Sequence, residues 1–311
     1  KVYVLGNQSS GKSCLLAGLE ILSDLDRESG VAISAEGESK RVLTELAASI
    51  RQGRFPASTT AAIRLNVKFK YKEFKYKEHD FSCTWVDYPG ERFKDSFGRG
   101  EQDFADIEDI RDGDFFLIVL APGDDIPLSK DNAQDDTDTQ AHADRLSALW
   151  SALEKLRRER KNTRPTHVAA LVTKADLLQD APMTPSDAEK DLKERAPEVL
   201  NNLRDSFRHM PVFAVSAVGN TVTPDGKTVF PDKDQLNPWG YDHIVKWIGG
   251  RVCADSRVPW IRKIKFGTLV IAVIIAAGWG WQKTGQYHAA NEVRSLLIGT
   301  VSEEERPGFE E

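Results

Sequence analysis

Gly6-Asn7-Gln8-Ser9-Ser10-Gly11-Lys12-Ser13 (GNQSSGKS) stands near the beginning of the chain, directly after the apolar run of residues 1–5 (KVYVL). A segment follows in which Leu15, Leu16, Leu19 and Leu22 recur at the spacing of one helical face. The octapeptide fits the pattern GxxxxGK followed by Ser or Thr, which binds phosphate when it lies between a strand and a helix. The sequence therefore predicts a phosphate-binding loop that joins a buried strand to a helix.

The residue types of this loop suit a nucleoside triphosphate. Gly6 and Gly11 allow a close approach of the backbone that a Cβ atom would block. The amide N–H groups can then form an anion-binding nest at the helix start, and Lys12 adds a positive charge for the β- and γ-phosphates. The Ser13 hydroxyl is a hard oxygen ligand of the kind that Mg²⁺ prefers. The predicted nucleotide contacts in this segment are Gly6, Asn7, Gln8, Ser9, Ser10, Gly11, Lys12, Ser13 and Cys14.

A second motif, Asp87-Tyr88-Pro89-Gly90, ends the strand-like run FSCTWVD. A carboxylate at the carboxyl tip of a strand beside the phosphate loop can hold Mg²⁺ through water, so Asp87 is a predicted metal residue. The backbone N–H of Gly90 is predicted to meet the γ-phosphate. The alternative for Asp87 is an ordinary aspartate in a turn.

Two further motifs are predicted to select the base. Thr173-Lys174-Ala175-Asp176 follows the apolar run VAALV, and a carboxylate at Asp176 can accept hydrogen bonds from N1–H and the 2-amino group of guanine. Adenine lacks both donors, which would leave the carboxylate unpaired. The stem of Lys174 can lie along the base. The alternative for Asp176 is a surface helix cap. Ser216-Ala217 follows PVFAV, and its backbone can reach guanine O6.

Strand-like and helix-like segments alternate along the chain, which indicates a sheet with right-handed crossovers and ligands at the carboxyl ends of its strands. The expected strands cover residues 1–5, 62–71, 81–87, 115–120, 168–172 and 212–215, and helices are expected at 38–51, 140–160, 186–208 and 241–252. We therefore expect an α/β, three-layer fold with a mostly parallel six-stranded sheet. The domain should cover residues 1–253, with a helical insertion at about 30–55.

An uncharged run near the end of the chain predicts a membrane helix at residues 264–282. Trp260, Trp279 and Trp281 sit at its ends, where indole rings favour the interface. Residues 254–263 form a basic linker before it, which predicts a single-pass anchor with the nucleotide-binding domain in the cytoplasm. The alternative is a buried core helix. Residues 283–311 form a tail, and the missing initiator Met predicts a piece of a longer protein.

Composition excludes several classes of function. The net charge of −6 over 311 residues gives no basic field for nucleic acid. The three cysteines lack CxxC spacing, which argues against a disulfide framework or a zinc site. An aspartate-rich stretch at residues 124–138 is expected to be a solvated loop. The lysines at 68, 70, 72, 75 and 77 are expected to protect an edge strand, with contact to anionic lipid as the alternative.

Together these motifs resemble the translation-factor-related (TRAFAC) class of P-loop GTPases over roughly residues 1–253. GNQSSGKS, DYPG and TKAD look more like dynamin-type forms than Ras-like ones. The resemblance implies GTP or GDP and Mg²⁺ as ligands, with Gln8 and Ser9 placing the attacking water. It also implies a switch I threonine, Thr60 or else Thr59, that closes over the metal. The implied catalytic residues are Lys12, Gln8, Ser9 and Thr60, and the implied metal residues are Ser13, Thr60 and Asp87.

Glu91 stands where Ras-like proteins carry a water-orienting glutamine, and the γ-phosphate would repel a carboxylate there. Three functions follow as hypotheses. The first is a membrane-anchored GTPase that switches an effector protein. The second is a dynamin-like membrane-remodelling GTPase that associates with itself. The third is a pseudo-GTPase that binds GTP without turnover.

Overall fold

The computed structural model describes residues 1–25, 30–57, 61–73, 77–90, 113–128, 166–207, 209–220, 230–254 and 291–292. The strands are β1 (Val2–Leu5), β2 (Val31–Ala35), β3 (Ile63–Glu73), β4 (Lys77–Asp87), β5 (Phe115–Leu120), β6 (His167–Val172) and β7 (Val212–Ala214). The helices are α1 (Lys12–Leu25), α2 (Gly37–Arg51), the 3-10 helix η1 (Ala175–Leu177), α6 (Pro185–Arg195), α7 (Pro197–Ser206), the 3-10 helix η2 (Lys233–Gln235) and a helix over residues 241–254. The chain divides into two units, Lys1–Gly250 and Arg251–Glu311, and the sheet belongs to the first.

The seven strands form one sheet in the order β2-β3-β4-β1-β5-β6-β7. The pairs from β4 through β1, β5 and β6 to β7 are parallel, whereas β2–β3 and β3–β4 are antiparallel. The α/β prediction is confirmed. The prediction of six mostly parallel strands is wrong, because the sheet has seven strands and is mixed. The missed strand is β2, which lies at the start of the helical insertion expected at about 30–55, before the helix expected at 38–51.

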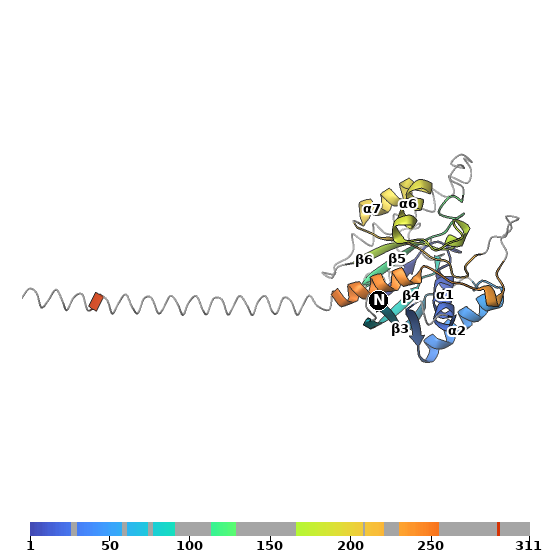
Figure 1. Ribbon diagram of the computed structural model, residues 1–311, viewed down its shortest axis with the longest axis horizontal. Coiled ribbons are helices and arrows are strands. Elements are labelled where there is room, and N and C mark those ends of the chain that lie inside the picture. Colours follow the sequence, from blue (N-terminus) through green and yellow to red (C-terminus); the bar gives the residue numbers. More distant parts are fainter. Residues whose placement is uncertain are drawn as a thin grey trace, which may run out of the picture. The chain divides into compact units, whose positions relative to one another are not determined.

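Helices cover both faces of the sheet (Figure 1), with α6 and α7 on one side and α1 and α2 on the other. The parallel strands are buried on both faces, which is why β5 reads FFLIVL without alternation. At residues 241–250, Tyr241 lies against Gly18 of α1, and Trp247 packs edge-on against Phe115 of β5. Parallel strands all end at the same edge of the sheet, so β1, β5 and β6 deliver their following loops to one place.

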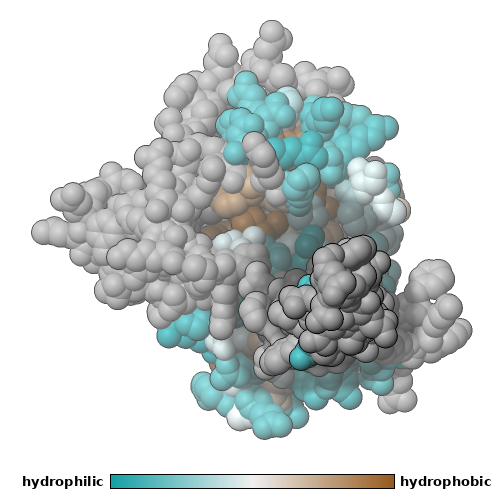
Figure 2. All heavy atoms as spheres, turned by 90° about the vertical axis from the view of Figure 1, so that its left-hand side faces the viewer, coloured by the Kyte–Doolittle hydropathy of each residue, from teal (hydrophilic) through white to brown (hydrophobic). Residues whose placement is uncertain are grey.

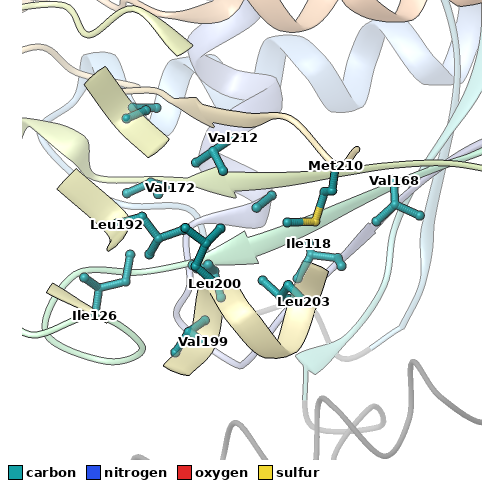
Figure 3. Close-up of a cluster of buried hydrophobic side chains, with 14 of the residues drawn as sticks. Ile118, Ile126, Val168, Val172, Leu192, Val199, Leu200, Leu203, Met210 and Val212 are labelled. Carbon is teal, nitrogen blue, oxygen red and sulfur yellow. The ribbon is translucent and has the colours of Figure 1, made fainter. Parts of the chain in front are cut away.

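The core between the sheet and helices α6 and α7 is shown in Figure 3. Ile118 of β5 and Val172 of β6 meet Leu192 of α6 and Leu200 of α7, and all four are at most 3% exposed. Full burial of each such side chain contributes about 1.5–3 kcal/mol. On the face of the molecule seen in Figure 2, the coloured residues are mainly hydrophilic, and hydrophobic ones show only between them.

Two local expectations are corrected by the structure. The helix expected at residues 186–208 is two helices, because Pro197 has no N–H to continue the first one and instead begins α7. The lysine-bearing strand β3 is not an edge strand, since it pairs with β2 on one side and β4 on the other. Lys68, Lys70 and Lys72 are exposed on the sheet face, and Lys68 forms an ion pair with Asp80 at 2.5 Å.

None of the described helices is long and apolar enough to cross a membrane. The span predicted at residues 264–282 lies outside the described residues, as do the linker from 255 to 263 and most of the tail. The helix expected at residues 140–160 lies there too, whereas the helices expected at 38–51 and 241–252 are confirmed as α2 and the helix over residues 241–254.

Candidate nucleotide-binding site

The phosphate loop connects β1 to α1, as predicted, and its backbone takes two left-handed turns. Ser9 has φ 61° and Gly11 has φ 86°. Such values favour glycine and are uncommon for serine, so the backbone at Ser9 is held in a conformation that few residues adopt. Gln8 and Ser9 are exposed at the crest of the loop. A Cβ atom on Gly6 would come within 2.8 Å of the Val119 carbonyl oxygen, which explains the glycine there.

Lys12 is buried beneath this loop, at 5% exposure. Its Nζ donates hydrogen bonds to the carbonyl oxygens of Gly6 at 3.0 Å and Asn7 at 2.6 Å. Burial lowers the pKa of the Lys12 ammonium, and the carboxylates of Asp87 and Asp125 oppose that shift. A desolvated ammonium at the start of a helix is suited to bind phosphate oxygens.

Ser13 and Asp87, the described residues of the predicted metal site, are in direct contact. The Ser13 hydroxyl donates a hydrogen bond to Oδ2 of Asp87 at 2.6 Å. Asp87 is fully buried, and its Oδ1 has no hydrogen-bond partner among the described residues. Burial raises the pKa of the Asp87 carboxyl, although the hydrogen bond from Ser13 and the charge of Lys12 act in the opposite direction. An orphaned buried carboxylate oxygen beside a serine hydroxyl fits Mg²⁺, whose ligands are hard oxygens.

Gly90 brings the second motif against the phosphate loop. A Cβ atom at Gly90 would lie 2.3 Å from the backbone nitrogen of Gln8 and 2.5 Å from the carbonyl carbon of Asn7. The turn that follows β4 therefore packs against the phosphate loop at Asn7 and Gln8. Thr59, Thr60 and Glu91 lie outside the described residues, so the structure does not place the predicted switch I threonine.

The third motif is tied to the first through Thr173. Its hydroxyl donates to the carbonyl oxygen of Ser10 at 2.5 Å, so the base-reading loop and the phosphate loop are in contact. Lys174 has a left-handed backbone with φ 48°, which turns the chain into η1. Asp176 lies in η1 and is 3% exposed. Its predicted role in binding the base stays a prediction.

The fourth motif lies beside the third. The backbone N–H of Ala175 donates to the carbonyl oxygen of Val215 at 3.1 Å, which joins the loops that follow β6 and β7. Ser216 is buried, and its Oγ accepts a hydrogen bond from the backbone N–H of Gly219 at 2.9 Å. The hydroxyl therefore shapes the loop that carries Ala217.

Two residues of this region were missed by the sequence reasoning. Asp125 was assigned to a solvated loop but is fully buried, and its Oδ1 accepts a hydrogen bond from Nδ2 of Asn7 at 2.7 Å. Tyr241 is 1% exposed, and its hydroxyl would lie 2.1 Å from a Cβ atom at Gly18 of α1. No motif marks either residue. The thiol of Cys14, a predicted nucleotide contact, has its pKa raised by burial to about 11 and so is protonated at neutral pH.

A family model and several solved structures match this chain. Residues 2–229 match the model of the family Double-GTPase 2. The fold is similar to the signal recognition particle receptor SRb-GTP/SRX complex from Chaetomium thermophilum, at 16% identity and TM-score 0.39, over 80% of this chain and 96% of that one. It is also similar to the Ski7 GTPase-like domain of S. cerevisiae bound to GTP, at 14% identity and TM-score 0.36.

That second match covers 80% of this chain but only 49% of the Ski7 chain, so this chain spans about half of its length. A comparison with curated proteins gave no match. The family match extends over the phosphate loop, the DYPG and TKAD motifs and the loop of Ser216. The chain is a P-loop, GTP-binding, GTPase-like protein, and it belongs to the Double-GTPase 2 family.

Proposed function

We propose that this domain hydrolyses GTP to GDP and phosphate with Mg²⁺ and acts as a nucleotide-dependent switch. The observation that carries the proposal is the contact between Ser13 and Asp87. A hydroxyl and a buried carboxylate meet at 2.6 Å next to Lys12, and Oδ1 of the carboxylate has no partner in the described part of the chain. Keeping such a group buried costs about 1–3 kcal/mol, so a ligand that satisfies it is expected.

The reaction is in-line attack of a water oxygen on the γ-phosphorus. The bond from that phosphorus to the oxygen bridging to the β-phosphate breaks, and GDP leaves. Ser13 and Asp87 would hold Mg²⁺, which when bound neutralises charge on the phosphate oxygens. Lys12 and the backbone amides of the loop bind the β- and γ-phosphates and stabilise the charge that develops in the transition state. The resemblance implies that Gln8 and Ser9 orient the water. Both residues are exposed in the phosphate loop, where a water could reach them.

Selection of guanine is proposed to rest on Asp176, supported by its 3% exposure. A carboxylate can accept hydrogen bonds from both N1–H and the 2-amino group of guanine. The switch would operate through Thr60 and residues 90–100, which would contact the γ-phosphate before hydrolysis and separate after it. We also propose, from the sequence alone, that residues 264–282 anchor the chain in a membrane with the domain in the cytoplasm. An effector protein or a second copy would be the partner.

Turnover of GTP and ATP by the 311-residue chain, measured against protein concentration with and without liposomes, tests the proposal. We expect Mg²⁺-dependent release of phosphate from GTP and none from ATP, at a rate per molecule that is independent of concentration. A rate that climbs with concentration and liposomes would instead support a dynamin-like remodelling enzyme. GTP that stays bound and intact for hours would overturn hydrolysis and leave a binding module.

A further inference from the structure

The turn that follows β5, here named the β5 turn (residues 121–126), carries two adjacent aspartates that contact different nucleotide loops. Asp125 is fully buried and accepts a hydrogen bond from Nδ2 of Asn7 in the phosphate loop at 2.7 Å. Asp124 is half-buried and pairs with Nζ of Lys174 in the base-reading loop at 3.5 Å. None of the four sequence motifs includes either aspartate.

The β5 turn is a rigid support for these contacts. The carbonyl oxygen of Ala121 accepts backbone hydrogen bonds from Asp125 at 2.6 Å and Ile126 at 3.1 Å, and the N–H of Gly123 donates to Ile126 at 2.8 Å. Ile126 is 1% exposed and packs into the core with the side chains of α6 and α7 (Figure 3). The position of the Asp125 carboxylate is therefore set by the core of the domain.

Asn7 connects this carboxylate to the phosphate-binding lysine. The side-chain amide of Asn7 donates a hydrogen bond to Asp125. The backbone carbonyl oxygen of Asn7 accepts a hydrogen bond from Nζ of Lys12 at 2.6 Å. Movement of Asn7 would move an acceptor that orients the ammonium group. It would also move the Asn7–Gln8 peptide, against which Gly90 packs directly.

We propose that Asp125 is a positioning residue of the nucleotide site, which holds the phosphate loop and Lys12 in their binding arrangement through Asn7. Its effect is a slow release of nucleotide. The inference rests on guanine-nucleotide binding at this loop, and it does not require hydrolysis.

A carboxylate offers one acceptor oxygen to each of two donors that face this position. Oδ1 of Asp125 accepts from Asn7, and Oδ2 accepts from the backbone N–H of Ala121 at 2.9 Å. An asparagine of the same size has one acceptor oxygen, so its NH₂ group would face one of the two donors. Asp125→Asn therefore removes a hydrogen bond without changing the volume of the side chain.

The test is the rate at which the full chain releases a fluorescent GDP analogue into excess unlabelled GDP. We expect Asp125→Asn to release it about tenfold to hundredfold faster, the range for losing a hydrogen bond to a charged group. Asn7→Ala, at a half-buried loop position, should do the same. The double variant should release the analogue little faster than either single variant, because both substitutions remove the same hydrogen bond between Asp125 and Asn7. The preference for GDP over ADP should persist, since Asp176 is intact.

Asp114→Asn is the matched control, because Asp114 directly precedes β5, at the end of the strand opposite the β5 turn. It should leave the release rate unchanged. If the wild-type chain binds GDP but Asn7→Ala and folded Asp125→Asn release it at the wild-type rate, the inference is wrong while the proposed function stands. Effects that multiply in the double variant would overturn it too. A wild-type chain that binds no guanine nucleotide would overturn both.

Discussion

Lys12 and Asp87 carry opposite charges and are both buried beneath the phosphate loop. Each is at most 5% exposed, yet neither is fully satisfied by the other. Lys12 donates to carbonyl oxygens of its own loop, and one oxygen of Asp87 has no partner among the described side chains and backbone. Such an arrangement is costly in the nucleotide-free protein and becomes favourable when phosphate and a cation complete it.

Asp87→Asn is predicted to stabilise the nucleotide-free protein at pH 7. The folded-state pKa of Asp87 is raised, mainly by burial, so the folded protein keeps this proton at pH values where the unfolded chain has lost it. The stability that this group contributes is thus present at low pH and is lost as pH rises through the folded pKa. The neutral amide avoids that loss, and the melting temperature should rise by about 2–4 °C, which corresponds to about 1 kcal/mol.

Urea denaturation at pH 5 and pH 8 checks this sign, because the advantage of the variant should grow with pH. The same variant should lose Mg²⁺-dependent GTP binding. A variant that is less stable than wild type at pH 8 would show that the ionised carboxylate is stabilising in the folded protein.

Asp176→Asn is predicted to weaken GTP binding by roughly 100-fold and to strengthen binding of XTP. The amide offers one acceptor where guanine presents two donors, and its own NH₂ suits the additional oxygen of xanthine. Competition of GTP and XTP against a labelled nucleotide measures both affinities. Asp180→Asn, an exposed substitution four residues away, is the control. Unchanged preference for GTP in Asp176→Asn would remove this residue from base recognition.

At the scale of elements, the sequence patterns were most informative where a run was long or a motif was present. The strand before the phosphate loop, the buried run FFLIVL and α2 were all predicted. The strand β2 was not, because VAISA is five residues with small side chains and gains its structure from pairing with β3. Helices α6 and α7 were merged because the apolar spacing continues across Pro197, whose effect on the backbone outweighs that spacing.

The helix over residues 241–254 offers a matched pair of glycines. A Cβ atom on Gly249 would lie 2.3 Å from the ring of Tyr71 in β3, whereas one on Gly250 would meet nothing within 4 Å. Gly249→Ala should therefore destabilise the domain by about 1–3 kcal/mol through overpacking. Gly250→Ala should stabilise it by about 0.5–1 kcal/mol through helix propensity.

Urea denaturation of the two variants gives both free energies of unfolding, and neither variant should change GTP affinity. Equal changes in the free energy of unfolding for the two variants would mean that Gly249 packs less closely against Tyr71 than the structure shows.

For the whole molecule, the four motifs were predicted to converge because parallel strands end at one edge, and the structure places the described motif residues at that edge. What the sequence could not reveal is how the loops are joined. The contact of Asp125 with Asn7 spans 118 positions, and that of Thr173 with Ser10 spans 163. Contacts of this separation arise from the topology, and no local pattern around an aspartate distinguishes a buried anchor from a solvated one.

The predicted membrane anchor belongs to this scale as well. The 311-residue chain should float with liposomes in a density gradient and stay with them at alkaline pH, whereas a chain ending at residue 256 should remain at the bottom. The physical reason is the burial of the apolar run at 264–282, which far outweighs surface charge. Recovery of the full chain in the bottom fraction would favour the alternative of a buried core helix.

Calorimetric titration of the nucleotide-free chain with GTP and then ATP, in the presence and absence of Mg²⁺, tests the central assignment most directly. We predict saturable binding of GTP that is strengthened by Mg²⁺, no detectable heat from ATP, and loss of the GTP signal in Lys12→Ala. A folded wild-type chain that binds neither nucleotide, or that binds ATP as well as GTP, would contradict the assignment of residues 6–13 and 173–176 to a guanine-nucleotide site.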